Sequence, residues 1–443
     1  MSEETLGYRG EALQLLKQAK AQIGDIVRLT KDNETYEGIL IPRSEYGDDK
    51  HIVLKLKTGY NIGIKVTSMT KIEKAGEGAK PAFLAPPLPK QKSGMPKVAI
   101  ISTGGTIASR VDYRTGAVRP ALTASDLYSV VPELSEIATI DAEILFNIFS
   151  EDIACQHWTK LAEAIAKRIE KGEDGIVVAH GTDTMGYTAA AMSFALQELS
   201  VPVVLVGAQR SADRPSSDAA TNLTGAVVVA ARAPFAEVVL AMHETPSDKA
   251  IELHRGTRVR KCHTSRRDTF KSINAEPLGK VENTEIVMLT SDFRRRNDSR
   301  KVVLKSGFEE KVALLKFHPN LDPETITHYA DKGYRGIVLE GTGLGHVSNT
   351  CLPAIRNAVE KEVIVAMTSQ CIWGRVDMNV YDRGRDLLKL GVIPLEDMLS
   401  ETALVKLMWV LGQTKDVEKA KKLLTTNLVH EISLRTLSEP TQG

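Results

Sequence analysis

Two short loops rich in glycine and threonine carry the side chains best suited to chemistry. The first, Thr103-Gly104-Gly105-Thr106-Ile107-Ala108, follows a predicted buried strand at 98–102. The second, His180-Gly181-Thr182-Asp183-Thr184-Met185, follows a predicted strand at 175–179. In parallel sheets, ligands gather at the carboxyl ends of the strands, where both loops are expected. Each loop therefore offers a threonine hydroxyl to a ligand at one edge of a sheet.

Simpler interpretations of both loops remain open from the residues alone. The paired glycines of the first loop allow a sharp turn and a close approach to a ligand. That loop lacks the G-x-G-x-x-G and Walker spacings, which leaves a tight turn or a weak phosphate loop as alternatives. The second loop precedes a predicted helix at 187–199, and threonine and aspartate are common helix N-caps. Capping is therefore as plausible for Thr182 and Asp183 as reaction.

A lysine further along the chain completes a possible relay. Lys261 lies in the polar segment Arg258-Val259-Arg260-Lys261-Cys262-His263-Thr264. Taken alone, it reads as a solvated surface charge. If it is buried beside Thr182 and Asp183, it makes a threonine–lysine–carboxylate relay, because burial lets a lysine accept a proton. A threonine hydroxyl is a poor nucleophile until such a base takes its proton.

The two loops together resemble the signatures of the L-asparaginase family of amidohydrolases. T-G-G-T-I-A at Thr103–Ala108 and H-G-T-D-T-M at His180–Met185 match both family motifs at the expected separation. The resemblance extends from Lys97 to about Gln413. It implies hydrolysis of the side-chain amide of a small amino acid, with release of ammonia.

The resemblance also implies roles for individual residues. Thr106 is similar to the first active-site threonine and Tyr113 to the mobile-loop tyrosine of the family. Ser150 and Glu151 resemble the pair that holds the α-carboxylate and α-amino group of the substrate, with help from Asp183. The second threonine and its partners correspond to Thr182, Asp183 and Lys261. Which threonine attacks first stays open.

The beginning of the chain departs from a plain L-asparaginase. Short β-prone runs at 24–29, 35–41, 51–56 and 60–64 predict a small SH3- or Tudor-like β-barrel within residues 1–75. A proline-rich linker is predicted at 76–95. Phe149 also stands before Ser150, where the family commonly has small residues. With the extra domain, the sequence is most similar to the GatD branch of the family, which belongs to the archaeal glutamyl-tRNA(Gln) amidotransferases.

That resemblance implies a division of labour within a complex, a carbon–nitrogen ligase with glutamine as amido donor. This chain would hydrolyse glutamine or asparagine and pass ammonia to a partner protein, GatE, which amidates glutamyl-tRNA(Gln). It implies a homodimeric core in a heterotetramer, with tRNA bound through the complex. No cofactor is expected in this chain, since no Walker A motif is present, so ATP and Mg²⁺ are expected in GatE. The alternatives are a free-standing cytoplasmic L-asparaginase and a scaffold or RNA-binding protein with an inert core.

The elements that must position these residues alternate between strand and helix from Lys97 onward. Predicted strands at 98–102, 175–179, 201–206 and 237–242 are separated by helical patterns at 161–168, 187–199 and 219–231. Such alternation favours a doubly wound parallel sheet with helices on both faces. A second α/β unit begins near Val312. We therefore expect asparaginase-like domains at 96–305 and 306–443.

Composition limits the other classes of function. The net charge of 443 residues is +1, so the chain as a whole is no electrostatic clamp for nucleic acid. The four cysteines form no C-x-x-C pair, and no signal peptide or unbroken apolar span is visible. These features favour a soluble cytoplasmic protein. The histidines lack metal-binding spacing, so no metal site is expected.

Three further motifs have open interpretations. Gly341-Thr342-Gly343-Leu344-Gly345-His346 is expected to be a strand-end turn that lines the site from the second unit. Asp382 is a candidate to reach the active site of a neighbouring protomer. Arg294-Arg295-Arg296 is interpreted as a solvated face, with contact to tRNA or a partner as the minority alternative.

Overall fold

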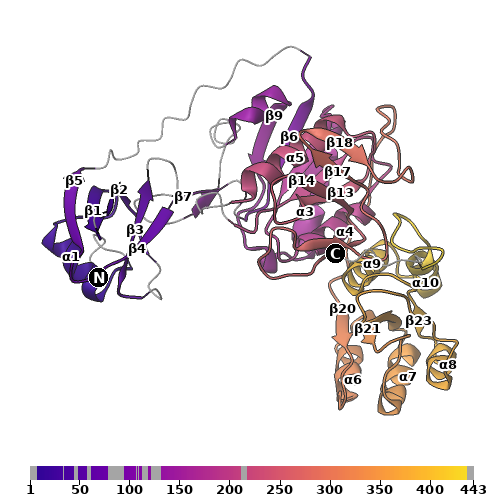
Figure 1. Ribbon diagram of the computed structural model, residues 1–443. Coiled ribbons are helices and arrows are strands. Elements are labelled where there is room, and N and C mark those ends of the chain that lie inside the picture. Colours follow the sequence, from indigo (N-terminus) through magenta and orange to yellow (C-terminus); the bar gives the residue numbers. More distant parts are fainter. Residues whose placement is uncertain are drawn as a thin grey trace.

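The computed structural model describes residues 7–32, 34–43, 48–56, 61–77, 94–105, 107, 109–111, 118–120, 131–210 and 217–436. They form a small β domain followed by two α/β domains (Figure 1). The predicted fold class is confirmed. Most of the predicted linker at 76–95 lies outside the described residues.

The small domain is an antiparallel sheet of five strands in the order β4-β3-β2-β1-β5, packed against one helix. Its core includes Leu16 of the helix and Leu29, Leu40 and Leu54 of the strands, all fully buried. The last strand was not predicted from the sequence. The elements are α1 (Gly10–Gln18), β1 (Ile26–Lys31), β2 (Glu34–Leu40), β3 (His51–Leu56), β4 (Asn61–Lys65) and β5 (Lys71–Gly76).

The first α/β domain is built on an eight-stranded sheet of order β18-β17-β14-β13-β12-β10-β6-β9. The five strands β9, β6, β10, β12 and β13 are parallel. The remaining three run antiparallel, so the sheet is mixed rather than wholly parallel as predicted. The strands are β6 (Lys97–Ser102), β9 (Thr139–Ile144), β10 (Gly175–Ala179), β12 (Val203–Val206), β13 (Val238–His243), β14 (Ala250–Arg255), β17 (Gly279–Glu282) and β18 (Glu285–Met288).

Alternation along the parallel strands divides the core between the two faces of this sheet. Ile176 and Val178 of β10 face α3 (Cys155–Glu170) and α4 (Met185–Ala195), whereas Val177 and Ala179 face α5 (Ala219–Arg232). Because both faces are covered, these strands are apolar throughout. Short pairs add β7 (Ser109–Val111) with β8 (Val118–Pro120), β11 (Leu196–Gln197) with β19 (Val303–Leu304), and β15 (Val259–Lys261) with β16 (Phe270–Ser272). Single 3₁₀ turns are η2 (Pro132–Glu136) and η3 (Ser150–Asp152).

The second α/β domain has a parallel sheet of order β20-β21-β22-β23. Helices α6 and α7 pack against each other, and α9 covers the sheet and also contacts α4 of the first domain. There Trp409 stacks on Phe194 with ring centroids 5.7 Å apart. The elements are β20 (Val312–Lys316), α6 (Glu324–Asp331), β21 (Gly336–Gly341), η4 (Asn349–Cys351), α7 (Leu352–Glu360), β22 (Ile364–Ser369), α8 (Asp382–Lys389), β23 (Ile393–Pro394), α9 (Ser400–Gln413) and α10 (Val417–Thr425).

One buried ion pair joins the two α/β domains, and a second joins Glu431 to α9. Arg258 Nη1 lies 3.1 Å from Asp397 Oδ2, and each side chain is 2% exposed. Lys406 Nζ lies 2.6 Å from Glu431 Oε1, and both side chains are fully buried. Arg258 Nε also donates to the carbonyl of His430. None of the described helices combines the length and apolarity needed to span a bilayer.

Candidate active site

Loops at the carboxyl ends of three neighbouring strands meet because several positions have no side chain. Gly104 follows β6 with φ of +118°, and a Cβ atom there would lie 2.1 Å from the carbonyl oxygen of Ile148. A Cβ atom on Gly105 would lie 2.8 Å from the backbone nitrogen of Gly181, in the loop after β10. Only glycine fits such contacts. The two sequence motifs are therefore packed against each other.

Thr182, Asp183 and Lys261 form one hydrogen-bonded group. Lys261 Nζ donates to Thr182 Oγ1 at 2.9 Å and to Asp183 Oδ1 at 2.9 Å. Lys261 ends β15, whose hairpin with β16 directs it toward the loop after β10. Its side chain is 15% exposed, whereas that of Asp183 is 69% exposed. Lys261 is thus not the solvated surface charge that it resembles in isolation.

The capping interpretation of the second loop does not describe its side chains. Thr184 is the N-cap residue of α4, and it makes no capping hydrogen bond with its side chain. Its hydroxyl instead donates to the carbonyl oxygen of Ser150 at 2.6 Å. Thr182 and Asp183 both contact Lys261. The polar groups of this loop therefore face other loops of the site.

Thr182 is held from below by the loop after β12. A Cβ atom on Gly207 would lie 2.8 Å from Thr182 Cγ2 and 2.9 Å from the carbonyl oxygen of His180. Gly207 thus lies in direct contact with the methyl group of the threonine, and the hydroxyl is left for Lys261. Gly207 was not predicted from the sequence, because the loop after β12 carries no recognised motif.

The proposed substrate-holding pair lies beside this group. Ser150 and Glu151 begin η3, and Ser150 Oγ donates to Glu151 Oε2 at 3.4 Å. Ser150 is buried, and a Cβ atom added to Gly181 would lie 2.8 Å from the Cβ atom of Ser150. Phe149, directly before it, is 74% exposed. The pair is therefore close to Thr182 in space as well as in the family motif.

Two candidate residues, Thr106 and Tyr113, lie outside the described residues. The structure brings together Ser150, Glu151, Thr182, Asp183 and Lys261, and their catalytic roles stay a prediction. His180 is an addition. It is fully buried, its Nδ1 lies 2.6 Å from the Gly181 carbonyl oxygen, and burial lowers its pKa to about 4. A neutral imidazole therefore supports the loop at neutral pH.

Two of the three remaining motifs make structural contacts. Gly341–His346 is a strand-end turn closed by a hydrogen bond from the Thr342 nitrogen to the His346 carbonyl oxygen, and its Gly345 packs on Met367. Asp382 begins α8, and its contact with a neighbouring protomer stays a prediction. The arginine run is not a simple solvated face. Arg296 is 20% exposed and donates to the carbonyl oxygen of Ala231, so its side chain is held against the last turn of α5.

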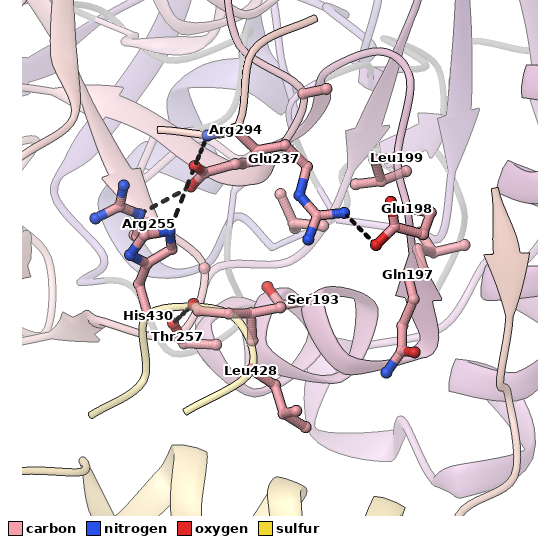
Figure 2. Close-up of a pocket in the computed structure, with 15 residues that line it drawn as sticks. Ser193, Gln197, Glu198, Leu199, Glu237, Arg255, Thr257, Arg294, Leu428 and His430 are labelled. Carbon is pink, nitrogen blue, oxygen red and sulfur yellow. Dashed lines mark hydrogen bonds and ion pairs between the residues drawn. The ribbon is translucent and has the colours of Figure 1, made fainter. Parts of the chain in front are cut away.

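Figure 2 shows a cavity of about 200 Å³. It is lined by Ser193 in the last turn of α4, whereas Thr182 and Asp183 lie before the first turn of that helix. Its charged groups are already paired. Glu237 accepts from Arg255 Nε at 2.8 Å, and Arg294 Nη1 lies 3.1 Å from Glu198. Thr257 donates to the Val429 carbonyl oxygen. The cavity therefore lies where residues 428–430 pack against the first α/β domain.

The sequence and fold match known families over most of the chain. The asparaginase N-terminal family matches residues 97–294, the glutaminase/asparaginase C-terminal domain matches 311–424, and the GatD N-terminal domain matches 21–74. The GatD protein of the glutamyl-tRNA(Gln) amidotransferase from Pyrococcus abyssi is 53% identical over 95% of this chain and 97% of its own length. That of Methanopyrus kandleri is 50% identical over 96% and 94%. This chain belongs to the GatD family of glutamyl-tRNA(Gln) amidotransferase subunits.

Solved structures relate the GatD family to L-asparaginases. The thermostable L-asparaginase from Thermococcus kodakarensis is 32% identical with a TM-score of 0.69, over 76% of this chain and 99% of that one. The probable cytoplasmic L-asparaginase from Campylobacter jejuni is 27% identical with a TM-score of 0.63, over 75% and 100%. Both are covered almost in full by about three quarters of this chain. This member of the GatD family therefore has a region that these enzymes lack.

Proposed function

We propose that this chain is the glutaminase component of a tRNA-dependent amidotransferase that converts glutamyl-tRNA(Gln) to glutaminyl-tRNA(Gln). The observation that carries the chemistry is the contact of Lys261 Nζ with both Thr182 Oγ1 and Asp183 Oδ1. The match of residues 21–74 to the GatD N-terminal domain favours the amidotransferase over a free-standing L-asparaginase. A lysine that is only 15% exposed and contacts a threonine hydroxyl favours a catalytic site over an inert scaffold.

The proposed reaction uses the threonines as nucleophiles. With its amine uncharged, Lys261 can accept the proton of the Thr182 hydroxyl, and the neighbouring carboxylate of Asp183 stabilises the ammonium that results. The hydroxyl of Thr106 or Thr182 attacks the carboxamide carbon of glutamine or asparagine. Ammonia leaves with the proton that Lys261 returns to it, and water hydrolyses the acyl-threonine ester to the free acid and the threonine hydroxyl. Backbone N–H groups of the glycine loops can stabilise the oxyanion, an effect worth roughly 10²–10³ in rate per donor.

We further propose that the ammonia passes to GatE, which supplies the ATP and Mg²⁺ chemistry on tRNA(Gln). The names of the relatives support a multi-protein enzyme. A homodimeric core within a heterotetramer and a cytoplasmic location belong to the same proposal. The four cysteines, all free, favour a reducing compartment.

The test is ammonia release by the purified chain from glutamine and from asparagine, with and without GatE, ATP, Mg²⁺ and glutamyl-tRNA(Gln). We expect slow release by the chain alone and a large increase when all the components are present. Rapid asparagine hydrolysis at a rate that the added components do not change would instead support a free-standing L-asparaginase. Absence of ammonia under every condition would support an inert core.

A further inference from the structure

A chain of buried polar groups begins directly beneath Thr182. Asn222 of α5 is fully buried, and its Nδ2 donates to the Gly207 carbonyl oxygen at 3.0 Å and to Asp218 Oδ2 at 2.9 Å. Asp218, also fully buried, accepts from the backbone nitrogens of Gln209 and Arg210. Asp218 and Asn222 therefore set the path of the loop from 207 to 210, whose first residue contacts Thr182.

The chain continues through His243 at the end of β13. His243 is fully buried, with Nδ1 at 2.5 Å from Asn222 Oδ1 and Nε2 at 3.0 Å from Asp248 Oδ1. Asp248 is 62% exposed, and Arg267 Nη1 donates to its Oδ1 at 2.9 Å. Arg267 lies in the 262–269 turn of the hairpin that carries Lys261. The contacts thus run from the loop beneath Thr182 to the hairpin that carries Lys261.

The hydrogen-bond partners determine the charge on His243. The amide nitrogen of Asn222 faces two oxygen acceptors, so its oxygen is the atom that faces His243 Nδ1. His243 Nδ1 is therefore a donor. Contact with His243 and the charge of Arg267 lower the pKa of Asp248, which is ionised at neutral pH and only accepts. His243 Nε2 must also carry a hydrogen.

We propose that His243 is an imidazolium cation in the folded protein and acts as a positioning residue, tying the loop beneath Thr182 to the hairpin that carries Lys261. The inference deepens the proposed function and rests on it for the roles of Thr182 and Lys261. The charged groups around the ring are Asp248 in direct contact, Asp218 through Asn222, and Arg267 through Asp248. Besides the proposed imidazolium, these groups carry two negative charges and one positive charge.

The first test is the protonation state of the ring, measured by nitrogen NMR on protein labelled in its ten histidines. His243 should show two protonated ring nitrogens at pH 7.5. Asp248→Asn offers an amide donor to Nε2, so the ring should become neutral in that variant. Asp331→Asn, another half-exposed carboxylate in an ion pair, is the matched control and should change no ring. A neutral His243 in the wild-type protein overturns the proposal.

The second test is kinetic. Asp248→Asn should lower kcat for ammonia release about tenfold and leave KM within twofold, because misplaced reacting groups slow chemistry while Ser150 and Glu151 are untouched. Asp248→Glu keeps the carboxylate and should restore kcat to within about threefold of wild type. A kcat for Asp248→Asn equal to that of Asp331→Asn contradicts the positioning role.

A third readout needs no activity and separates this inference from the proposed function. Amide hydrogen exchange of the segments 207–210 and 262–269 should rise together in Asp248→Asn and stay unchanged in Asp331→Asn. Unchanged exchange in both segments refutes the link between them. If wild-type protein releases no ammonia, the proposed function fails, while the NMR and exchange results still decide the state and role of His243.

Discussion

Replacing Lys261 by methionine separates catalysis from stability at the candidate site. The change removes the amine that contacts Thr182 Oγ1 and Asp183 Oδ1, each at 2.9 Å, and keeps most of the apolar length of the side chain. Loss of a general base slows a reaction by about 10²–10⁴, equivalent to roughly 3–5 kcal/mol in the activation barrier. We expect kcat to fall by that factor.

The same change should hardly affect folding. Asp183 is 69% exposed, so water replaces the lost ammonium, and an exposed ion pair contributes only about 0–1 kcal/mol. The free energy of unfolding, measured with denaturant, should therefore stay within about 1 kcal/mol of wild type.

The assay is steady-state ammonia release with the complete set of components, beside Lys271→Met as the control. Lys271 lies on the same hairpin, where it is paired across the strands with Arg260 rather than with Lys261. Its replacement should leave kcat within about threefold. If Lys261→Met keeps more than a tenth of the wild-type kcat, Lys261 is not the proton acceptor and the relay is wrong.

Three more outcomes are expected. Lys406→Met leaves Glu431 buried without its cation and should lower the free energy of unfolding by about 3–5 kcal/mol in denaturant titrations, whereas Lys419→Met at an exposed position should not. Gly207→Ala places a Cβ atom 2.8 Å from Thr182 Cγ2 and should lower kcat at least tenfold, whereas Gly63→Ala, with open space around its Cβ position, should not. His180 has a folded pKa of about 4 against an ordinary 6.5, so the unfolded chain binds its proton more tightly and acid destabilises the fold. Between pH 6.5 and pH 4, protonation of His180 should lower the free energy of unfolding by about 3 kcal/mol. His180→Asn should abolish this contribution, whereas His318→Asn, at an exposed position, should keep it. The measurement is the free energy of unfolding of each variant as a function of pH, compared with wild type.

The candidate site was predictable to the extent that its residues lie in recognisable motifs. Thr182 and Asp183 follow a buried strand, which alone indicates a position at the ligand-binding edge of a sheet. Lys261 is different, since its local sequence indicates a surface charge, and only its spacing within the family pattern places it in the site. The contact with Thr182 joins residues 79 positions apart, which no local pattern encodes.

The structural support of the site was beyond sequence reasoning. Asn222 lies in an apolar helix and His243 ends an apolar strand, so each looks like an isolated polar residue in a hydrophobic run. Their contact depends on how α5 packs against the sheet. The antiparallel edge was also missed, because β18 alternates between exposed and half-buried residues and lacks the continuous apolar run of the central strands. Tertiary packing decides both features.

The ion pair between Arg258 and Asp397 has a consequence for protein synthesis. Arg258 lies three positions before Lys261, and its counterion enters the chain 139 residues later. A nascent chain folds from its N-terminus as it leaves the ribosome, so this guanidinium has no buried partner until the second α/β domain is almost complete. We therefore expect the hairpin that presents Lys261 to reach its final packing only after Asp397 has been synthesised and has folded.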